Sequence, residues 1–108
     1  MFEKLKKVSE SIEHETDPIQ KFNKTVQLAS FCHMKIVKIH PFKDAHGRTA
    51  RIIANMILAR GGVHPFVCFN STEYEKAVMD SISKGNQIFI EYLKKIIETN
   101  IKYENFFS

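Results

Sequence analysis

Residues 40–51 hold the densest group of reactive side chains in the sequence and read His-Pro-Phe-Lys-Asp-Ala-His-Gly-Arg-Thr-Ala-Arg. The stretch contains two imidazoles, one carboxylate and two guanidinium groups. An imidazole can act as a general base near neutral pH, a carboxylate can bind a hard cation, and guanidinium groups suit phosphate oxygens. These residue types favour a site for a magnesium-bound polyphosphate with a base beside it.

Two helices are predicted to position this stretch. Pro41 cannot continue a helix and disfavours helical geometry at His40, so the helix before it is predicted to stop at about Ile39. From Gly47 onward, apolar residues recur at three- and four-residue spacing, which predicts a second helix. The reactive residues would then occupy a tight loop and the first turn of the second helix.

The start of the second helix is predicted to bind an anion, because the first N–H groups of a helix lack partners and carry partial positive charge. The small residues Ala45 and Gly47 would let an anion approach those amides. Arg48 and Arg51 are three residues apart and project from one face, with Asn55 a turn further along. The alternative for the two arginines is that they form surface ion pairs.

Asp44 and His40 complete the predicted site. Asp44 could hold a Mg²⁺ ion that bridges phosphates, or it could cap the helix that begins beside it. His40 could serve as a general base, or it could simply be a helix-terminal histidine stabilised by the dipole. A third arrangement would make His40, Asp44 and His46 ligands of a transition metal.

The stretch resembles the signature of Fic domains, His-x-Phe-x-Asp/Glu-Gly-Asn-Gly-Arg-x-x-Arg, and the similarity covers about residues 18–98. Two positions depart from it: Ala45 stands where Gly is usual, and His46 stands where Asn is usual. Alanine also occurs there in the death-on-curing relatives, which act as kinases. Those relatives carry Lys where this chain has Gly47, so the sequence sides with the nucleotidyltransferases.

The resemblance implies a protein adenylyltransferase, which transfers AMP from ATP, with Mg²⁺ as cofactor, to a Ser, Thr or Tyr hydroxyl of a target protein. It implies that His40 is the catalytic base and that Asp44 binds the magnesium ion. The other signature positions would bind the nucleotide and its phosphates: Ala45, His46, Gly47, Arg48 and Arg51. One alternative is transfer of another nucleotide or of a phosphate. Another is a degenerate Fic fold that acts as a non-catalytic protein-binding module, which the two departures favour.

Two further family features have counterparts to look for. Fic domains usually carry a β-hairpin flap upstream of the signature, and here the hairpin would have to precede Met1. Many members are inhibited by a glutamate on a Ser/Thr-x-x-x-Glu-Gly/Asn helix, and the run from Asn100 to Asn105 matches this pattern except at Asn100. Glu104 is therefore a candidate inhibitory residue, with a polar chain terminus as the alternative. An antitoxin partner or a homo-oligomer is compatible with the resemblance.

Composition restricts the class of protein. A chain of 108 residues with 44% hydrophobic content predicts one folded domain, 1–108, with its core at about 18–101. The net charge of +4, without basic clusters interleaved with aromatic residues, argues against a nucleic-acid partner. Cys32 and Cys68 are predicted to be buried free thiols. Because the sequence has no long apolar run and no signal peptide, no membrane contact is expected and the cytoplasm is the expected location.

Periodicity and capping signals predict helices over about 2–15, 18–39, 47–60, 71–84 and 87–101. The fold class is therefore an all-α, single-domain bundle of about five helices, with the signature between the second and third. The third helix is almost entirely apolar beyond its first turn and is predicted to be buried on most sides. His33 lies on the apolar stripe of the second helix, so a hydrogen-bonded core role is favoured over a catalytic one. The rest of that predicted stripe is Ile19, Phe22, Val26, Ala29, Ile36 and Val37.

Overall fold

Asp17 and Pro18 begin the first long helix, α2 (Pro18–Ile39), as the sequence predicts. The Asp17 carboxylate accepts a hydrogen bond from the N–H of Ile19 at 2.9 Å and so caps the first turn. Proline suits the first helical position because its missing N–H would have no helical partner there. The start of α2 is therefore fixed by local chemistry.

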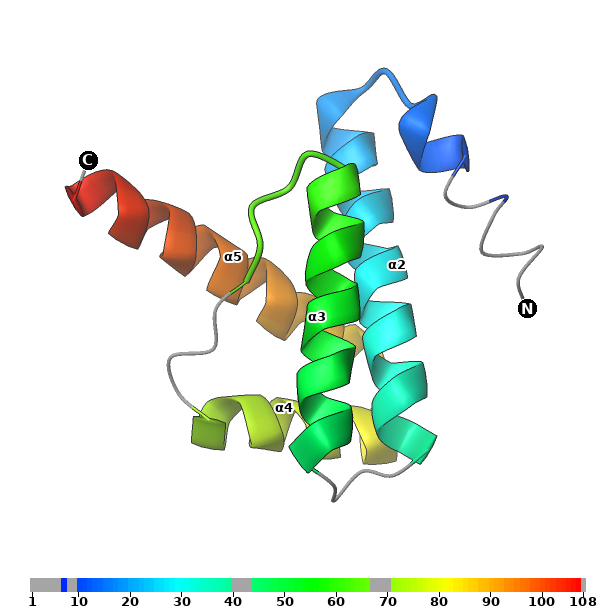
Figure 1. Ribbon diagram of the computed structural model, residues 1–108, viewed down its shortest axis with the longest axis vertical. Coiled ribbons are helices and arrows are strands. Elements are labelled where there is room, and N and C mark those ends of the chain that lie inside the picture. Colours follow the sequence, from blue (N-terminus) through cyan, green and yellow to red (C-terminus); the bar gives the residue numbers. More distant parts are fainter. Residues whose placement is uncertain (1–6, 8–9, 40–43, 67–70, 108) are drawn as a thin grey trace.

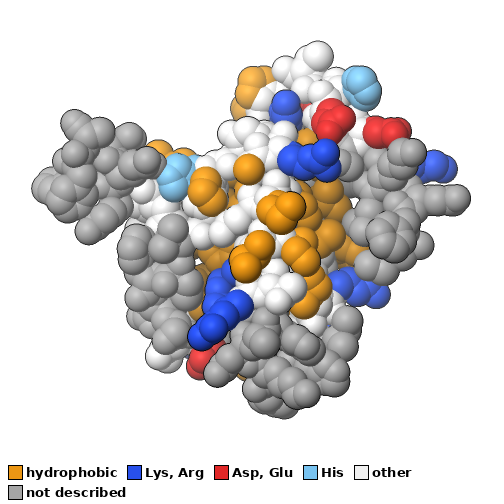
Figure 2. Space-filling view, viewed as in Figure 1, with side chains coloured by type: hydrophobic (Ala, Val, Ile, Leu, Met, Phe, Trp, Pro, Cys, Tyr) orange, Lys and Arg blue, Asp and Glu red, His pale blue; other side chains and the backbone are white. Residues whose placement is uncertain are grey.

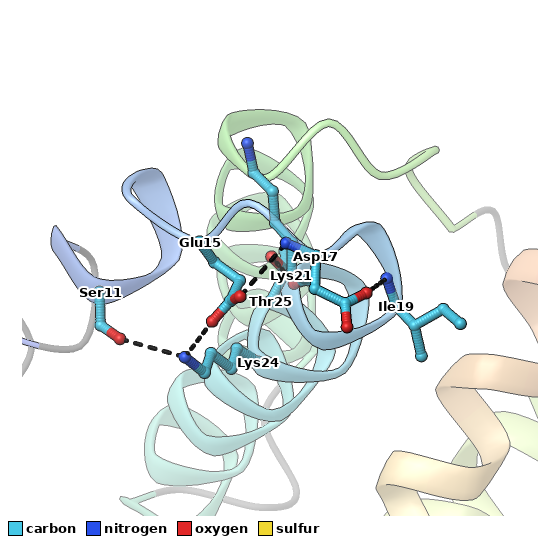
Figure 3. Close-up of polar contacts among 7 residues, drawn as sticks. All are labelled: Ser11, Glu15, Asp17, Ile19, Lys21, Lys24 and Thr25. Atoms are coloured by element: carbon cyan, nitrogen blue, oxygen red, sulfur yellow. Dashed lines mark hydrogen bonds and ion pairs between the residues drawn. The ribbon is translucent and has the colours of Figure 1, made fainter.

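The segment before α2 is attached to the side of the helix (Figure 3). Lys24 lies 2.6 Å from the Glu15 carboxylate and donates a longer hydrogen bond, of 3.4 Å, to the hydroxyl of Ser11. The hydrogen bond from Lys24 holds the pKa of Glu15 below its ordinary value. Ile12 of this segment is buried. Residues 7 and 10–13, which fall within the predicted helix 2–15, are helical, and the rest of its first half lies outside the described residues.

The computed structural model describes residues 7, 10–39, 44–66 and 71–107. Three more helices follow α2: α3 (Asp44–Arg60), α4 (Ser71–Lys84) and α5 (Gln87–Phe107). None of these residues forms a strand, so the prediction of an all-α fold is confirmed. No helix in the described ranges is long and apolar enough to cross a membrane.

The helices are arranged as two pairs (Figure 1). α2 and α3 lie side by side and antiparallel, whereas α4 crosses near their lower end and α5 runs diagonally behind them. The end of α2 and the start of α3 therefore lie together at the lower end of the bundle, beside α4. This is the end that carries the predicted site.

A glycine pair closes the upper end of α3. Gly62 has a φ of 73°, and the N–H of Val63 bonds to the carbonyl of Leu58 at 2.8 Å, which is the Schellman arrangement. Gly61 lies against α2, because a Cβ added there would be 2.2 Å from Oγ1 of the buried Thr25. The two glycines thus end the helix and allow α3 to approach α2 closely.

The core joins all four long helices, and its largest fully buried apolar side chains are Phe89, Met34, Leu58, Leu93 and Ile97. On α2, Val26, Ala29 and Val37 are buried as predicted. Ile19 is 70% exposed, so its predicted burial is wrong. It lies in the first turn of α2, before the stretch of that helix that contributes to the core cluster.

The predicted burial of α3 on most sides is also wrong. Ile52 is 61% exposed and Met56 is 63% exposed, and apolar side chains gather over the outer face of this helix (Figure 2). α3 packs mainly on α2. Its apolar side chains on the faces turned away from α2 are therefore not all covered by another helix of the described residues. At the other end of the chain, α5 continues to Phe107 instead of ending at about Ile101, and Ile101 is 40% exposed.

Candidate active site

α3 begins at Asp44, three residues earlier than the predicted start at Gly47. An acidic residue is favourable in a first helical turn because it faces the positive end of the dipole. The backbone of residues 44–47 therefore forms that first turn, whose N–H groups have no acceptors within the helix. The amides that the sequence predicts to bind an anion thus lie at the start of a 17-residue helix.

Several predicted site residues lie outside the described part of the structure. His40 falls between the end of α2 and the start of α3, at positions that the structure does not describe. For Asp44, Ala45, His46 and Gly47, only the helical backbone is described. The described residues contain no group of histidine, cysteine and acidic side chains that could hold a metal ion. The alternative of a transition-metal site involves His40 and so remains a sequence-based hypothesis.

The two predicted phosphate ligands follow on the same helix and differ in burial. Arg48 is exposed, whereas Arg51 is half-buried. The guanidinium carbon of Arg51 lies over the ring of Tyr74 on α4, 5.0 Å from the ring centroid. Figure 2 shows basic side chains gathered beside the lower part of α3. The guanidinium of Arg48 therefore lies in solvent, whereas that of Arg51 lies against an aromatic ring.

Tyr74 connects Arg51 to a buried histidine. Its hydroxyl hydrogen-bonds to Nε2 of His33 on α2, and both residues are buried. The His33 ring stacks on Phe89 of α5, with centroids 4.3 Å apart and an interplanar angle of 17°. The pKa of His33 is lowered to about 3, mainly by burial and to a smaller extent by the charge of Arg51. His33 is therefore a neutral core residue, as the sequence predicts.

Asn55 has a structural partner in the connector that follows α3. Its side chain accepts a hydrogen bond from the N–H of Phe66 at 2.9 Å and donates one to the carbonyl of the same residue at 3.2 Å. This paired contact fastens the connector after α3 to the middle of the helix. Asn55, on α3 beyond the two arginines as predicted, therefore has an anchoring role.

Glu104 and the two cysteines are the remaining residues for which the sequence makes a prediction. The last turns of α5, which carry Glu104, project away from the start of α3 (Figure 1). The side chain of Glu104 is outside the described part of the structure, so its inhibitory role stays a prediction. Cys32 is a half-buried free thiol whose pKa is raised by burial, and it is less buried than predicted. Cys68 lies outside the described residues.

The role of Tyr74 is the main feature of the site that sequence reasoning missed. A signal was present, because Tyr74, Ala77, Val78 and Ser81 form a buried stripe at helical spacing. A tyrosine on such a stripe needs a partner for its hydroxyl. The partner is 41 residues away in the sequence, and periodicity alone cannot name a contact at that separation.

The described part of the candidate site is thus a helical hairpin whose second helix carries Arg48 and Arg51 in its first two turns. The profile of the Fic/DOC family matches residues 1–58, and this chain belongs to that family. It is 30% identical over 108 residues to a protein of Caenorhabditis elegans named protein adenylyltransferase fic-1, covering 94% of this chain and 20% of that protein.

Two other relatives carry similar names. The protein adenylyltransferase fic-1 of Caenorhabditis briggsae is 32% identical over 79 residues, which cover 71% of this chain and 16% of the relative. The protein adenylyltransferase Fic of Nematostella vectensis is 48% identical over 42 residues, which cover 39% of this chain and 10% of that relative. This chain thus spans a fifth or less of the length of these relatives. No solved structure gives a significant match.

Proposed function

We propose that this chain is a protein adenylyltransferase that transfers AMP from Mg-ATP to a Ser, Thr or Tyr hydroxyl of a target protein. Membership of the Fic/DOC family and the names of the relatives support a nucleotidyltransferase. The observation that carries the proposal is the position of Arg51, half-buried over Tyr74 about two turns after the start of α3. A guanidinium fixed there is suited to bind phosphate oxygens.

In the proposed reaction, His40 accepts the proton of the target hydroxyl. The hydroxyl oxygen attacks the α-phosphorus of ATP, and the bond from that phosphorus to the bridging oxygen breaks. AMP is thereby joined to the protein and pyrophosphate leaves. The amides of the first turn of α3 stabilise charge on the α-phosphate, and Arg48 and Arg51 bind the leaving phosphates. This chemistry depends on positioning and charge neutralisation.

The residues at the start of α3 fit a magnesium-bound nucleotide. Asp44 opens the helix, and a carboxylate is a ligand that Mg²⁺ prefers. The two arginines on the following turns would supply further positive charge to the phosphate oxygens. Bound there by Asp44, Mg²⁺ would neutralise phosphate charge.

The proposal is tested by label transfer. Replacing His40 with alanine should lower transfer of label from α-³²P-ATP to protein in a cell lysate by about 100- to 10,000-fold, because a general base is lost. Circular dichroism would check that the variant stays helical. Full activity of the variant would remove His40 from the mechanism. Transfer of label from γ-³²P-ATP instead would indicate a phosphotransferase.

A second candidate is a protein-binding module without catalysis, which the residues Ala45 and His46 favour because they depart from the Fic signature. A histidine at position 46 can donate one hydrogen bond but is bulkier than asparagine and titrates. Absence of label transfer from α- and γ-labelled nucleotides would favour this module. For either function we propose a cytoplasmic location and, as regulator, an antitoxin, the segment around Glu104 or a second copy of the chain.

A further inference from the structure

We propose that Tyr74 and His33 are positioning residues for Arg51, holding its guanidinium in the orientation in which it binds nucleotide phosphate. This inference rests on the proposed function of Arg51. It assigns a role to a buried pair that comes from α4 and α2, outside the Fic signature.

The first step is the contact between Arg51 and Tyr74. The guanidinium carbon lies 5.0 Å from the centroid of the Tyr74 ring, within the range of a cation–π interaction. An arginine side chain has several rotatable bonds, and ordering them on phosphate binding weakens the affinity. A guanidinium that already rests on an aromatic face has less freedom to lose. Arg48, exposed on the previous turn, provides a comparison within the same helix.

The second step is the support of Tyr74 by His33. The phenol hydroxyl hydrogen-bonds to Nε2 of His33, and the imidazole is wedged against Phe89. His33 has no exposed surface and Tyr74 has 6%. In the tautomer whose Nε2 carries the lone pair, the phenol O–H donates this hydrogen bond, and its oxygen and ring face become more electron-rich. That change strengthens the attraction for the guanidinium above it.

The third step is the charge of His33. A protonated imidazole would place a second positive charge near Arg51 and would leave no lone pair to accept the proton of Tyr74. Burial opposes protonation, and Nδ1 of His33 has no hydrogen-bond partner among the described residues that would stabilise the charged ring. The cluster therefore contains a single cation, which is Arg51.

Binding of Mg-ATP tests the inference quantitatively. Replacing Tyr74 with leucine should weaken the affinity for Mg-ATP by about 2- to 12-fold, the range expected when one long side chain must be ordered on binding. In an Arg51→Ala background the same replacement should change the affinity by less than about 2-fold, because Tyr74 acts through Arg51. A full, additive loss in that background would overturn the proposal. Tyr74→Phe, which keeps the ring, should lose less than Tyr74→Leu.

A second measurement needs no nucleotide. In NMR spectra of the free protein, the Arg51 side-chain protons should be shifted upfield by the Tyr74 ring relative to those of Arg48. The shift should vanish in Tyr74→Leu and decrease in both Tyr74→Phe and His33→Gln. As a matched control, Phe31→Leu removes an exposed ring from under Lys35, 5.9 Å away, and should leave Arg51 unchanged.

The two measurements separate the inference from the function on which it rests. If the wild-type chain binds no Mg-ATP, the proposed function fails, while the Arg51 shifts still decide whether Tyr74 and His33 hold this side chain. Unshifted Arg51 signals in a folded wild-type protein would overturn the positioning role. Tyr74→Phe removes only the hydroxyl oxygen that bonds to His33, so the variant is expected to fold. It therefore still tests the role of this hydrogen bond if His33→Gln does not fold.

Discussion

His33 and Arg51 belong to one contact cluster, yet their surroundings give them opposite roles. Arg51 reaches the surface from an aromatic face and keeps its charge available, whereas His33 is enclosed by rings and stays neutral. A reactive residue type therefore does not identify a catalytic group by itself. For His33, the environment converts a potential base into a support for Tyr74.

The burial of His33 predicts how stability depends on pH. Its pKa is lowered to about 3 in the folded chain, against 6.5 in the unfolded chain, so below pH 6.5 the unfolded state binds the proton first. Stability is unaffected by His33 above that pH and falls as the pH is lowered toward 3. At pH 5 the loss should be about 2 kcal/mol relative to pH 8. Urea unfolding at each pH measures it.

The variant His33→Gln isolates the contribution of His33 to the pH dependence of stability. It should be less stable at pH 8 but should lose the decline between pH 7 and pH 5 that His33 causes. Glu15, whose pKa is lowered, adds acid sensitivity only near and below pH 4.5, outside this window. A wild-type protein whose free energy of unfolding stays constant from pH 7 to pH 5 would contradict the neutral, buried state of His33.

At the level of the helices, the sequence predicts boundaries well where a residue type forces them. Asp17 and Pro18 start α2, and Gly61 with Gly62 ends α3, as predicted. The start of α3 differs from the prediction because the apolar spacing begins only at Gly47, whereas Asp44 is already a favourable first-turn residue. The end of α5 is missed because no glycine or proline follows Ile101 to stop the helix.

The adjacent glycines at the end of α3 should respond differently to alanine. Gly61→Ala should lower the free energy of unfolding by about 1–3 kcal/mol, because its Cβ would overlap Thr25 on α2. Gly62→Ala should lower the free energy of unfolding by about 1–2 kcal/mol, because alanine is strained at a φ of 73°. Steric overlap does not contribute, since nothing lies within 4 Å of the added carbon. Denaturant unfolding measures both.

The replacement Thr25→Ala distinguishes the two causes. It removes the two side-chain atoms closest to the added carbon, at 2.2 and 2.4 Å, so it should recover part of the loss in Gly61→Ala. It should recover nothing in Gly62→Ala, whose strain lies in its own backbone. Equal recovery in both variants, or in neither, would show that contact with Thr25 does not set the cost at Gly61.

For the whole molecule, the fold class could be predicted from periodicity, whereas the way the helices share the site could not. The site cluster takes His33 from α2, Arg51 from α3, Tyr74 from α4 and Phe89 from α5. Such contacts depend on packing between distant segments, and helical periodicity reports only which face is apolar. The exposure of Ile52 and Met56 on the outer face of α3 could not be predicted for the same reason, because their apolar types do not show whether another helix covers them.

Because this cluster joins all four long helices, a nucleotide that binds Arg51 should stabilise the bundle as one unit. At a Mg-ATP concentration about 100 times its dissociation constant, the gain is about 2.7 kcal/mol, which should raise the Tm by about 10 °C in a single transition. Scanning calorimetry with Mg-ATP, and with Mg²⁺ alone as control, measures the shift. Arg51→Ala should show a smaller shift at the same concentration. An unchanged Tm at millimolar Mg-ATP would remove the nucleotide from the site and leave the protein-binding module as the better account of this chain.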